Sequence, residues 1–544
     1  PLSFDDVIFR ISPKDAARVT LTNVEVGEPA SGASVILSEV SVAVAPLPLL
    51  HREIALVDAS VTGVFLTLER GADGKFAFAG NSGAVNSPDL PTLIGQIDTW
   101  LSDPRFAQLD QVEANAVTLR YEDRRARRGW TADGGRISIS RRDGTLRLNS
   151  DLALLTGGTG VATVALSAES EIGQSDLSFG VSVTDLPSED IASQSPALAW
   201  LDTIRAPISG ALRGYLDGEG ALGGLDATLN ISEGVLQPSD SATPIAFKTA
   251  RTYFSYAPAS QSLNFTEIYV DSERGSGRAE GQVSVSLTDD NLLDAFVGQF
   301  SISDVNADAE GVFDIPLVVS RVDVDAQLRL QPFKLELGRI RVADPDLPLT
   351  AKGSLSVGEA GWEGRIDGRV RRAKAPEVLN YWPVKVSPKT RNWAMTNVQS
   401  GNVTNGVLAL RFRQGEKPKF YLDFAFQDAQ VRFAKTLPPV TAAKGQFTLF
   451  DRRLGVVVDE GVVKPKDGGA INVAGSKFVI PDGRIKPAQG QLSLVANGQA
   501  KALFSFLDSE PINLLSKIRQ PLDFVDAQLQ AKGTLSLPLV KGGR

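Results

Sequence analysis

The chain has 544 residues, a formal net charge of −8 and a pI near 5.1, which is the wrong sign of charge for a protein that must neutralise nucleic-acid phosphates. It contains no cysteine and a single histidine, so disulfides, thiolate catalysis and zinc–thiolate sites are excluded. Hydrophobic residues make up 42% of the chain, but 50 glycines and 30 prolines interrupt it too often for long helices. The composition therefore favours a long array of strands over a set of helical domains.

The beginning of the chain predicts a segment of a longer protein. It starts at Pro1, its one methionine is Met395, and we expect the upstream part to be absent. The most lipid-like run, Val42 to Leu50, is short and contains two prolines, whereas a membrane-spanning helix needs about 20 apolar residues. No part of this sequence is therefore expected to cross a bilayer.

Alternation of apolar and polar residues runs through the whole chain and predicts strands with one apolar face. In the cleanest stretch, Phe420 to Gln427, every second residue is phenylalanine or leucine. The residues expected on these apolar faces are Ile137, Ile139, Leu146, Leu148, Val322, Val324, Leu328, Leu330, Phe420, Leu422, Phe424, Phe426, Leu529, Leu535 and Leu537.

Asp-Gly and Asn-Gly pairs separate many of these runs, and such pairs favour type I′ turns between antiparallel strands. They begin at Asp73, Asp133, Asp143, Asp217, Asp367, Asn405, Asp467, Asp482 and Asn497. The sequence therefore predicts a sheet in which most strands pair with their neighbours along the chain.

Helical periodicity is confined to four short islands, at 93–101, 197–204, 376–382 and 503–518. Each of the last three is followed by a glycine-containing alternating strand, at Gly210, Gly401 and Gly533. We interpret these segments as degenerate repeats of one unit, a short helical segment followed by a run of strands.

One motif resembles a known family. Residues Tyr381-Trp382-Pro383, Pro388, Thr390-Arg391, Trp393, Asn397-Val398 and Gly401 resemble the signature of the central region of YhdP-type proteins, in the AsmA-like superfamily that also holds TamB. The opening region, with its alternating strands, its Pro46 to Leu50 link and its Asp73-Gly74 turn, is similar to an AsmA-type N-terminal unit. The expected domains are an AsmA-type β unit at 1–85, a helix plus β meander at 86–185, a second helix-capped β repeat at 186–370 and a YhdP-type central region at 371–544.

The resemblance implies a mainly β fold, an elongated, repetitive antiparallel sheet curved into an open apolar groove with a few short amphipathic helices. Proteins of this kind are anchored in the inner membrane by a helix, which this segment lacks, and project into the periplasm. There they are thought to conduct phospholipids between the inner and outer membranes. Phospholipids, both membranes and other envelope proteins are the implied partners, without enzyme activity, cofactor, metal ion or nucleic acid.

The apolar residues named above form the candidate lipid-binding groove. From alternation alone, they fit the filled core of a closed β-sandwich as well as an open groove. Trp382, Arg391 and Trp393 are expected to fix a structural insertion. A basic cluster is expected to be either a solvated loop or a contact for lipid head groups or an acidic partner, and comprises Arg124, Arg125, Arg127 and Arg128.

Two other functions stay open. A scaffold or assembly factor for outer-membrane proteins would offer strand edges for strand addition. A carbohydrate-active β-solenoid enzyme would need two carboxylates across a cleft, which alternation cannot identify. His51 has no nucleophile motif beside it, and the Asp304 to Asp308 stretch lacks the turn glycine of a calcium loop, so neither predicts a site.

Overall fold

The computed structural model describes residues 2–11, 16–28, 33–45, 48, 51, 53–71, 76–80, 83–86, 99, 103, 106–124, 128–155, 161–194, 196–288, 293–307, 317–345, 348–382, 384, 388–485 and 487–539. Strands dominate, most pair antiparallel, and the helices are few and short, so the predicted mainly β fold is confirmed. The chain forms two compact units that interleave along the sequence. The first contains Pro1–Leu236, Lys248–Ile268 and Gln282–Leu293, and the second contains Gln237–Phe247, Tyr269–Gly281 and Asp294–Arg544.

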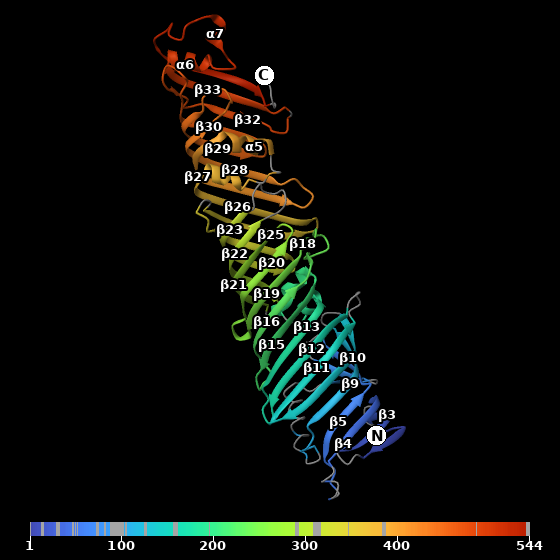
Figure 1. Ribbon diagram of the computed structural model, residues 1–544. Coiled ribbons are helices and arrows are strands. Elements are labelled where there is room, and N and C mark those ends of the chain that lie inside the picture. Colours follow the sequence, from blue (N-terminus) through green and yellow to red (C-terminus); the bar gives the residue numbers. More distant parts are fainter. Residues whose placement is uncertain are drawn as a thin grey trace. The chain divides into compact units, whose positions relative to one another are not determined.

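The first unit is built from strands that follow one another in space much as they do in sequence (Figure 1). Its strands are β1 (Leu2–Ser3), β2 (Asp6–Arg10), β3 (Ala17–Glu28), β4 (Ala33–Val44), β5 (Leu56–Thr62), β6 (Phe65–Arg70), β7 (Phe76–Gly80), β8 (Gly83–Asn86), β9 (Gln111–Asp123), β10 (Arg128–Arg142), β11 (Thr145–Leu155), β12 (Val161–Glu171), β13 (Leu177–Pro187), β14 (Ile204–Arg205), β15 (Pro207–Leu216), β16 (Leu222–Ile231), β17 (Gly234–Leu236) and β19 (Thr249–Ala257). Its helices are α3 (Ser188–Ala192) and the 3-10 turns η1 (Pro196–Thr203) and η2 (Pro258–Ser260). Strands β20 (Ser262–Ser272), β21 (Gly275–Leu287) and β22 (Leu293–Ala307) contribute residues to both units.

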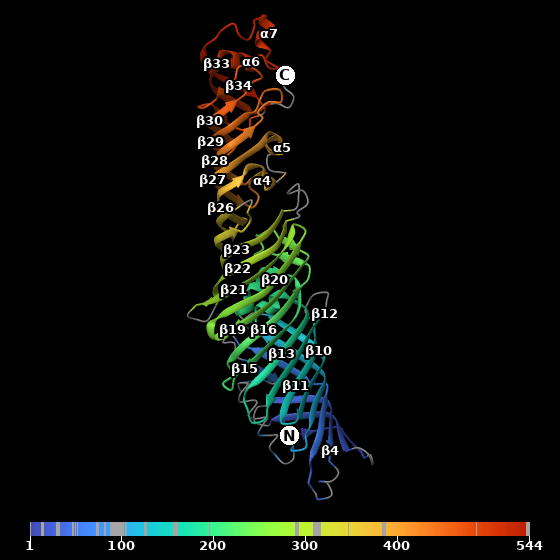
Figure 2. The same cartoon turned by 60° about the vertical axis from the view of Figure 1, so that its left-hand side comes forward.

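The second unit has the same plan, and Figure 2 shows α4 and α5 beside the ends of β26 and β27. Its strands are β18 (Ile245–Phe247), β23 (Leu317–Leu330), β24 (Phe333–Val342), β25 (Leu349–Gly358), β26 (Gly361–Lys374), β27 (Val398–Arg413), β28 (Lys419–Val431), β29 (Val440–Phe450), β30 (Arg453–Val463), β31 (Ile471–Asn472), β32 (Lys477–Ile480), β33 (Gln489–Gln499) and β34 (Gln528–Pro538). Its helices are α4 (Ala375–Asn380), α5 (Pro388–Asn397), α6 (Ala500–Leu507) and α7 (Leu514–Ile518).

Most strands pair antiparallel with the next strand along the chain, as the alternation and turn pattern predict. Two parallel pairings lie near the beginning, where β5 and β6 both pair with β9. In these ladders Asp58 lies opposite Gln111 and Phe65 opposite Thr118. The parallel pairing brings residues of β6 next to residues about 50 positions later in the chain.

Non-glycine residues in the left-handed backbone conformation occur inside several strands. Where they coincide with a one-residue shift of the ladder they form β-bulges, which bend a strand and increase its twist. Their φ values lie between 50° and 53°, and they are Ala116, Asp185, Asn405, Asp428 and Ala442.

Each bulge divides its strand into two arms and shifts the alternation by one residue. In β9, the residues on one face are Val112 and Ala114 before the bulge and Val117 and Leu119 after it. The partners of Ala114 and Val117 in β10 are Ile137 and Gly135, which are two residues apart and therefore on one face. Val117 is 0% exposed, whereas Val112 and Ala114 are half-buried. The two arms of a strand therefore have different environments.

Short helical segments join three pairs of neighbouring strands in place of a hairpin turn. We call them clasp 1 (α3 and η1, between β13 and β15), clasp 2 (α4 and α5, between β26 and β27) and clasp 3 (α6 and α7, between β33 and β34). Clasp 3 packs Ala502 and Leu503 into a buried cluster with Val463, Ile471 and Ala496. Clasp 2 likewise packs Val378 and Tyr381 against the buried Val370 and Ala373 of β26.

The predicted helical islands at 376–382 and 503–518 are confirmed by clasps 2 and 3, and the island at 197–204 is a 3-10 turn. The island at 93–101 lies outside the described residues apart from Thr99. The structure divides the chain into two interleaved units, and the four-domain division stays a prediction.

The prediction that every Asp-Gly and Asn-Gly pair forms a turn is wrong. Asp143-Gly144 is a hairpin turn, with φ of 54° and 79°, but Asp133-Gly134 and Asn405-Gly406 lie at bulges inside strands. Asp367-Gly368 lies in the middle of β26, and Asn497-Gly498 lies inside β33, directly before its last residue. A bulge needs the same left-handed tolerance as a turn, so the dipeptide does not distinguish the two. The remaining pairs lie in connections at Asp217, Asp467 and Asp482, while Asp73 lies outside the described residues.

Replacing Asn405 by valine should destabilise the second unit, because a β-branched residue is strained in the left-handed conformation. We expect Asn405→Val to lower the free energy of unfolding by about 1–2 kcal/mol, whereas Asn405→Gly should change it by less than about 0.5 kcal/mol. Chemical denaturation of both variants checks this. Equal stability of the two variants would show that the bulge does not constrain this position.

Candidate functional site

The apolar face of the first unit is continuous across five neighbouring strands. Val112 of β9 lies opposite Ile139 of β10, which lies opposite Leu148 of β11. The row continues with Ala168 of β12 and Phe179 of β13. Residues directly opposed in a ladder lie on one face of the sheet. All five side chains are only half-buried, so the row forms an apolar surface that solvent still reaches.

The opposite face of the same strands is polar. Arg147 and Glu169 lie directly opposite one another there, with 3.1 Å between Nη2 and Oε1. In the second unit Lys444 and Glu460 form the same kind of pair at 3.0 Å. Exposed pairs of this kind stabilise the fold little, but they make this face of the strands polar in both units.

The second unit repeats this arrangement with larger side chains. Leu408 of β27 lies opposite Leu422 of β28, which lies opposite Leu449 of β29. In the next pair along the same strands, the rings of Phe424 and Phe447 are stacked, with centroids 4.8 Å apart and an interplanar angle of 17°. These five side chains are half-buried as well.

The fifteen predicted groove residues lie in five strands, and none of them is fully buried. Phe420, Leu535 and Leu537 are 39%, 48% and 41% exposed, and the other twelve are half-buried. The filled core of a closed sandwich would bury such side chains almost completely. The twelve are Ile137 and Ile139 of β10, Leu146 and Leu148 of β11, Val322, Val324, Leu328 and Leu330 of β23, Leu422, Phe424 and Phe426 of β28, and Leu529 of β34.

Clasp 1 and the strand ends on its side contain fully buried apolar residues. Leu201 of clasp 1 and Ile208 of β15 are 0% exposed, and Leu154 of β11 and Ala162 of β12, which lie opposite one another, are 1% exposed. Burial of apolar surface is the main stabilising term in folding. These buried residues therefore form a core beside the row that contains Ile139 and Leu148, and they leave that row only half-buried.

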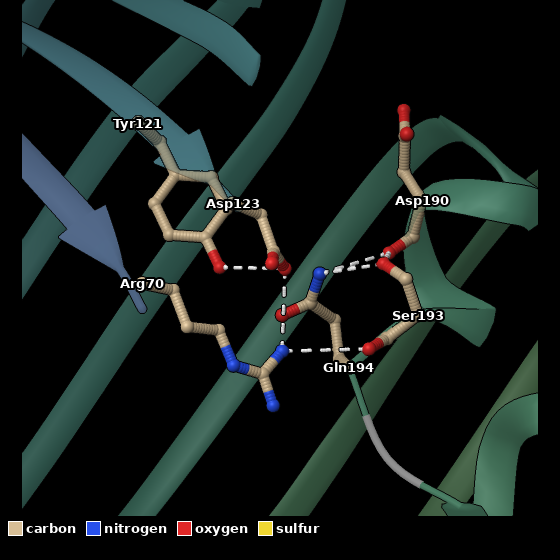
Figure 3. Close-up of polar contacts among 6 residues, drawn as sticks. All are labelled: Arg70, Tyr121, Asp123, Asp190, Ser193 and Gln194. Atoms are coloured by element: carbon tan, nitrogen blue, oxygen red, sulfur yellow. Dashed lines mark hydrogen bonds and ion pairs between the residues drawn. The ribbon is translucent and has the colours of Figure 1, made fainter. Parts of the chain in front are cut away.

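A buried polar cluster ties clasp 1 to β6 and β9 (Figure 3). Nη1 of Arg70 donates to Oδ2 of Asp123 at 3.3 Å and to the carbonyl oxygen of Ser193 at 3.4 Å. The hydroxyl of Tyr121 donates to the same carboxylate oxygen at 3.2 Å. The side chains of Arg70 and Asp123 are 11% and 1% exposed, so this ion pair is shielded from solvent. Such a pair is costly to break by removing one partner, and it fixes where clasp 1 docks.

The environment of this cluster changes the acidity of Tyr121. Burial, followed by the negative charge of Asp123, raises the pKa of the Tyr121 phenol to about 12. The phenol therefore stays a hydrogen-bond donor throughout the physiological range, and no proton transfer is expected from it there. The cluster is a structural latch rather than an acid–base site.

An open cleft of about 800 Å³ lies at the ends of β6, β9, β10 and β11, and Phe65, Trp130 and Leu155 contribute apolar surface to it. Arg124, which we expected to contact head groups, also lines this cleft but forms an ion pair with Glu69. Arg125 and Arg127 lie outside the described residues, and the side chain of Arg128, at the start of β10, does too. A head-group contact at this cluster stays a prediction.

The tryptophan and arginine residues of the family-like motif lie in clasp 2. Arg391 is 3% exposed, and its Nε donates to the carbonyl oxygen of Trp382 at 2.7 Å, which joins α5 to the end of α4. The hydroxyl of Tyr381 donates to Asp344 at 2.9 Å, and Trp393 is 46% exposed. The contacts of Arg391 fit the predicted role of this motif in holding a structural insertion.

Sequence reasoning missed both the latch and the bulges. No local pattern pairs Arg70 with Asp123, because the two meet only through the parallel pairing of β6 with β9. The bulges do leave a signal, since the alternation moves by one position between Ala114 and Val117 and again between Val183 and Leu186.

Comparison with known proteins gives one result. The family model described as YhdP protein matches residues 224–540, which is more than half of the chain. No curated protein and no solved structure matches. Among the helices that the structure describes, none is long and apolar enough to span a bilayer.

Truncating one leucine in each environment should distinguish the buried rim from the exposed face. Leu201→Ala removes a side chain that is 0% exposed and should lower the free energy of unfolding by about 2–5 kcal/mol. Leu148→Ala removes a half-buried side chain, so we expect a loss of about 1 kcal/mol. Denaturant titration measures both. A loss at Leu148 as large as that at Leu201 would mean that the face is closed.

The Tyr121 phenol should be among the last tyrosines to ionise. Because folding raises its pKa from 10.0 to about 12, its contribution to the free energy of unfolding is complete below pH 10 and is lost as the pH rises toward 12. We expect the difference in ultraviolet absorbance between the wild type and Tyr121→Phe to titrate near pH 12. A difference that titrates near pH 10 would contradict the burial of this group.

Proposed function

We propose, from the premise that the chain belongs to the YhdP protein family, that it carries phospholipids with their acyl chains on the two apolar faces and their head groups in solvent. The single observation that supports this most is the incomplete burial of all fifteen predicted groove residues. Soluble proteins rarely expose contiguous apolar patches without a function, so the uncovered apolar surface of these strands supports binding of an apolar ligand.

The physical basis of transport would be replacement of water by apolar side chains. Each Å² of acyl surface removed from water is worth about 25 cal/mol, so a lipid on the face avoids most of the penalty of crossing water. Neighbouring strands repeat the face every ~4.8 Å, which would let a lipid move from one strand to the next in small steps. No chemical step is part of this proposal, and among the described residues no group of three or more metal-ligating side chains occurs.

We further propose the periplasm as the site of action, with the inner and outer membranes as donor and acceptor of lipid. The direction of movement and its energy source would come from partners or from other parts of the protein. The resemblance of the central motif to YhdP-type proteins is the support for this placement.

A second candidate function is a scaffold for outer-membrane proteins, and β34 is the observation that favours it. Among the described strands β34 pairs only with β33, and nearly all of its residues are exposed. An unpaired strand edge can accept a further strand from another chain. Mass spectrometry of an organic extract separates the two functions, since a scaffold would carry no stoichiometric phospholipid.

Phe424→Asp should remove bound lipid without unfolding the protein. A carboxylate at this position would face the acyl chains, and an unpaired charge in apolar surroundings is strongly unfavourable. We expect the extracted phospholipid to fall at least twofold, while the thermal midpoint drops by only a few degrees.

Ala425→Asp is the matched control, because it places the same charge on the polar face of the same strand and should leave the lipid unchanged. If Phe424→Asp instead abolishes the cooperative melting transition, the side chain belongs to a closed core. The conduit would then be wrong for this strand.

A further inference from the structure

Residues Gln237–Phe247 belong to the second unit, although the chain on both sides of them belongs to the first. We call this segment the strap. The hydroxyl of Ser241 donates to the carbonyl oxygen of Gly358 at 2.9 Å, at the end of β25. The indole Nε1 of Trp362, at the start of β26, donates to the carbonyl oxygen of Thr243 at 2.7 Å. The strap is therefore attached to the end of the β25–β26 hairpin.

The side-chain amide of Gln414, directly after β27, completes this attachment. Its Nε2 donates to the carbonyl oxygen of Ser241 at 3.1 Å, and its Oε1 accepts from the backbone N–H of Thr243 at 2.9 Å. The same Oε1 also accepts from the backbone N–H of Trp362 at 3.2 Å. One glutamine thus joins the strap to β26 through both atoms of its amide.

The attachment lies at a rim of the apolar face of the second unit. Leu335 of β24 lies opposite Leu328 and Leu355 on that face. Phe333 begins β24 two residues before Leu335, and Trp362 of β26 lies opposite Val357, two residues beyond Leu355. The two rings meet edge to face at 5.7 Å and 87°, and both are less than 9% exposed. The strap therefore covers the rim at which the apolar face would otherwise open to solvent.

The two rims of β26 are closed by different forces. At its far end Val370 and Ala373 are buried against Val378 and Tyr381 of clasp 2, which is an apolar contact. The strap buries fully only Ala242, at 2% exposed, and it is held mainly by hydrogen bonds while its residues 243–246 stay exposed. Segments with little apolar burial belong to the parts of a protein that open most readily.

We infer that the strap is a releasable closure over this rim, and that phospholipid enters or leaves the apolar face of the second unit beneath it. This inference rests on the proposed lipid-carrying function and adds a gate to it. Opening breaks the contacts of Gln414 and Trp362 with the strap and exposes the Trp362–Phe333 pair. Closure restores these contacts over the bound acyl chain. The contacts that carry the inference all lie within the second unit.

The absence of cysteine from the chain makes a direct test possible. Ser241→Cys and Gly358→Cys place two thiols across the strap contact, and a side chain at Gly358 would meet nothing within 4 Å. The purified double variant is loaded with a fluorescent phospholipid and treated with a short bis-methanethiosulfonate, which forms one reducible disulfide with each cysteine thiol and releases methanesulfinate. Release into acceptor vesicles is then followed before and after reduction. We expect cross-linking to slow release from the second unit about tenfold and reduction to restore it.

Arg147→Cys with Glu169→Cys is the control pair, because it joins two strands that are already hydrogen-bonded on the polar face. Gln414→Leu tests the opposite direction, since it removes all three hydrogen bonds of the amide, two of which hold the strap, and we expect faster release from a protein with an unchanged melting profile. Equal release with and without the strap cross-link, equal slowing by the control pair, or wild-type release from Gln414→Leu would each overturn the gate and leave lipid carriage intact. Absence of bound lipid from the untreated protein would overturn the proposed function itself.

Discussion

The left-handed residue inside a strand is the constraint on which the rest of this architecture depends. A regular strand keeps its side chains on fixed faces, so a bend without an extra residue would break the ladder. The bulges at Asp185, Asn405 and Asp428 add that residue and shift the alternation, which keeps apolar side chains of both arms on one side. Asp and Asn tolerate this conformation best among the non-glycine residues, which accounts for three of the five positions.

Buried apolar side chains and exposed apolar surface lie in different parts of the strands. Apolar side chains next to the clasps are buried, as Ala496 is in the cluster with Leu503, and this burial stabilises the fold. Away from the clasps, the hydrogen bonds between strands order the backbone but leave the apolar face uncovered. The Arg70–Asp123 pair has a related role, because a buried ion pair contributes more to the choice of docking position than to stability. Clasp 1 is thereby held at one place on the sheet.

The sequence predicts the parts of this fold that depend on near neighbours. Alternation placed Phe424 on an apolar face, and helical spacing located clasps 2 and 3, because both periods are local. The bulges were not predicted, because Asn405-Gly406 has the composition of a hairpin turn. Only the strand that pairs with this dipeptide shows that it forms a bulge instead. The latch and the attachment of Gln414 join residues 53 and 173 positions apart, which no local period encodes. Alternation is also the same for a filled core and an uncovered face, so the exposure of Phe424 had to come from the structure.

The strap rim of the second unit can open while the clasp 2 rim stays closed, and the free energies of the contacts at the two rims explain why. The four hydrogen bonds that attach the strap to β25, Trp362 and Gln414, at about 1 kcal/mol each, contribute roughly 4 kcal/mol. An acyl chain that buries about 200 Å² on the apolar face gains about 5 kcal/mol at 25 cal/mol per Å². A bound acyl chain can therefore compete with the strap. It cannot compete with clasp 2, because displacing clasp 2 would expose the apolar side chains of Val370 and Ala373 to water. Polar contacts on one rim and apolar contacts on the other thus let a single sheet keep its fold while one side of its apolar face opens.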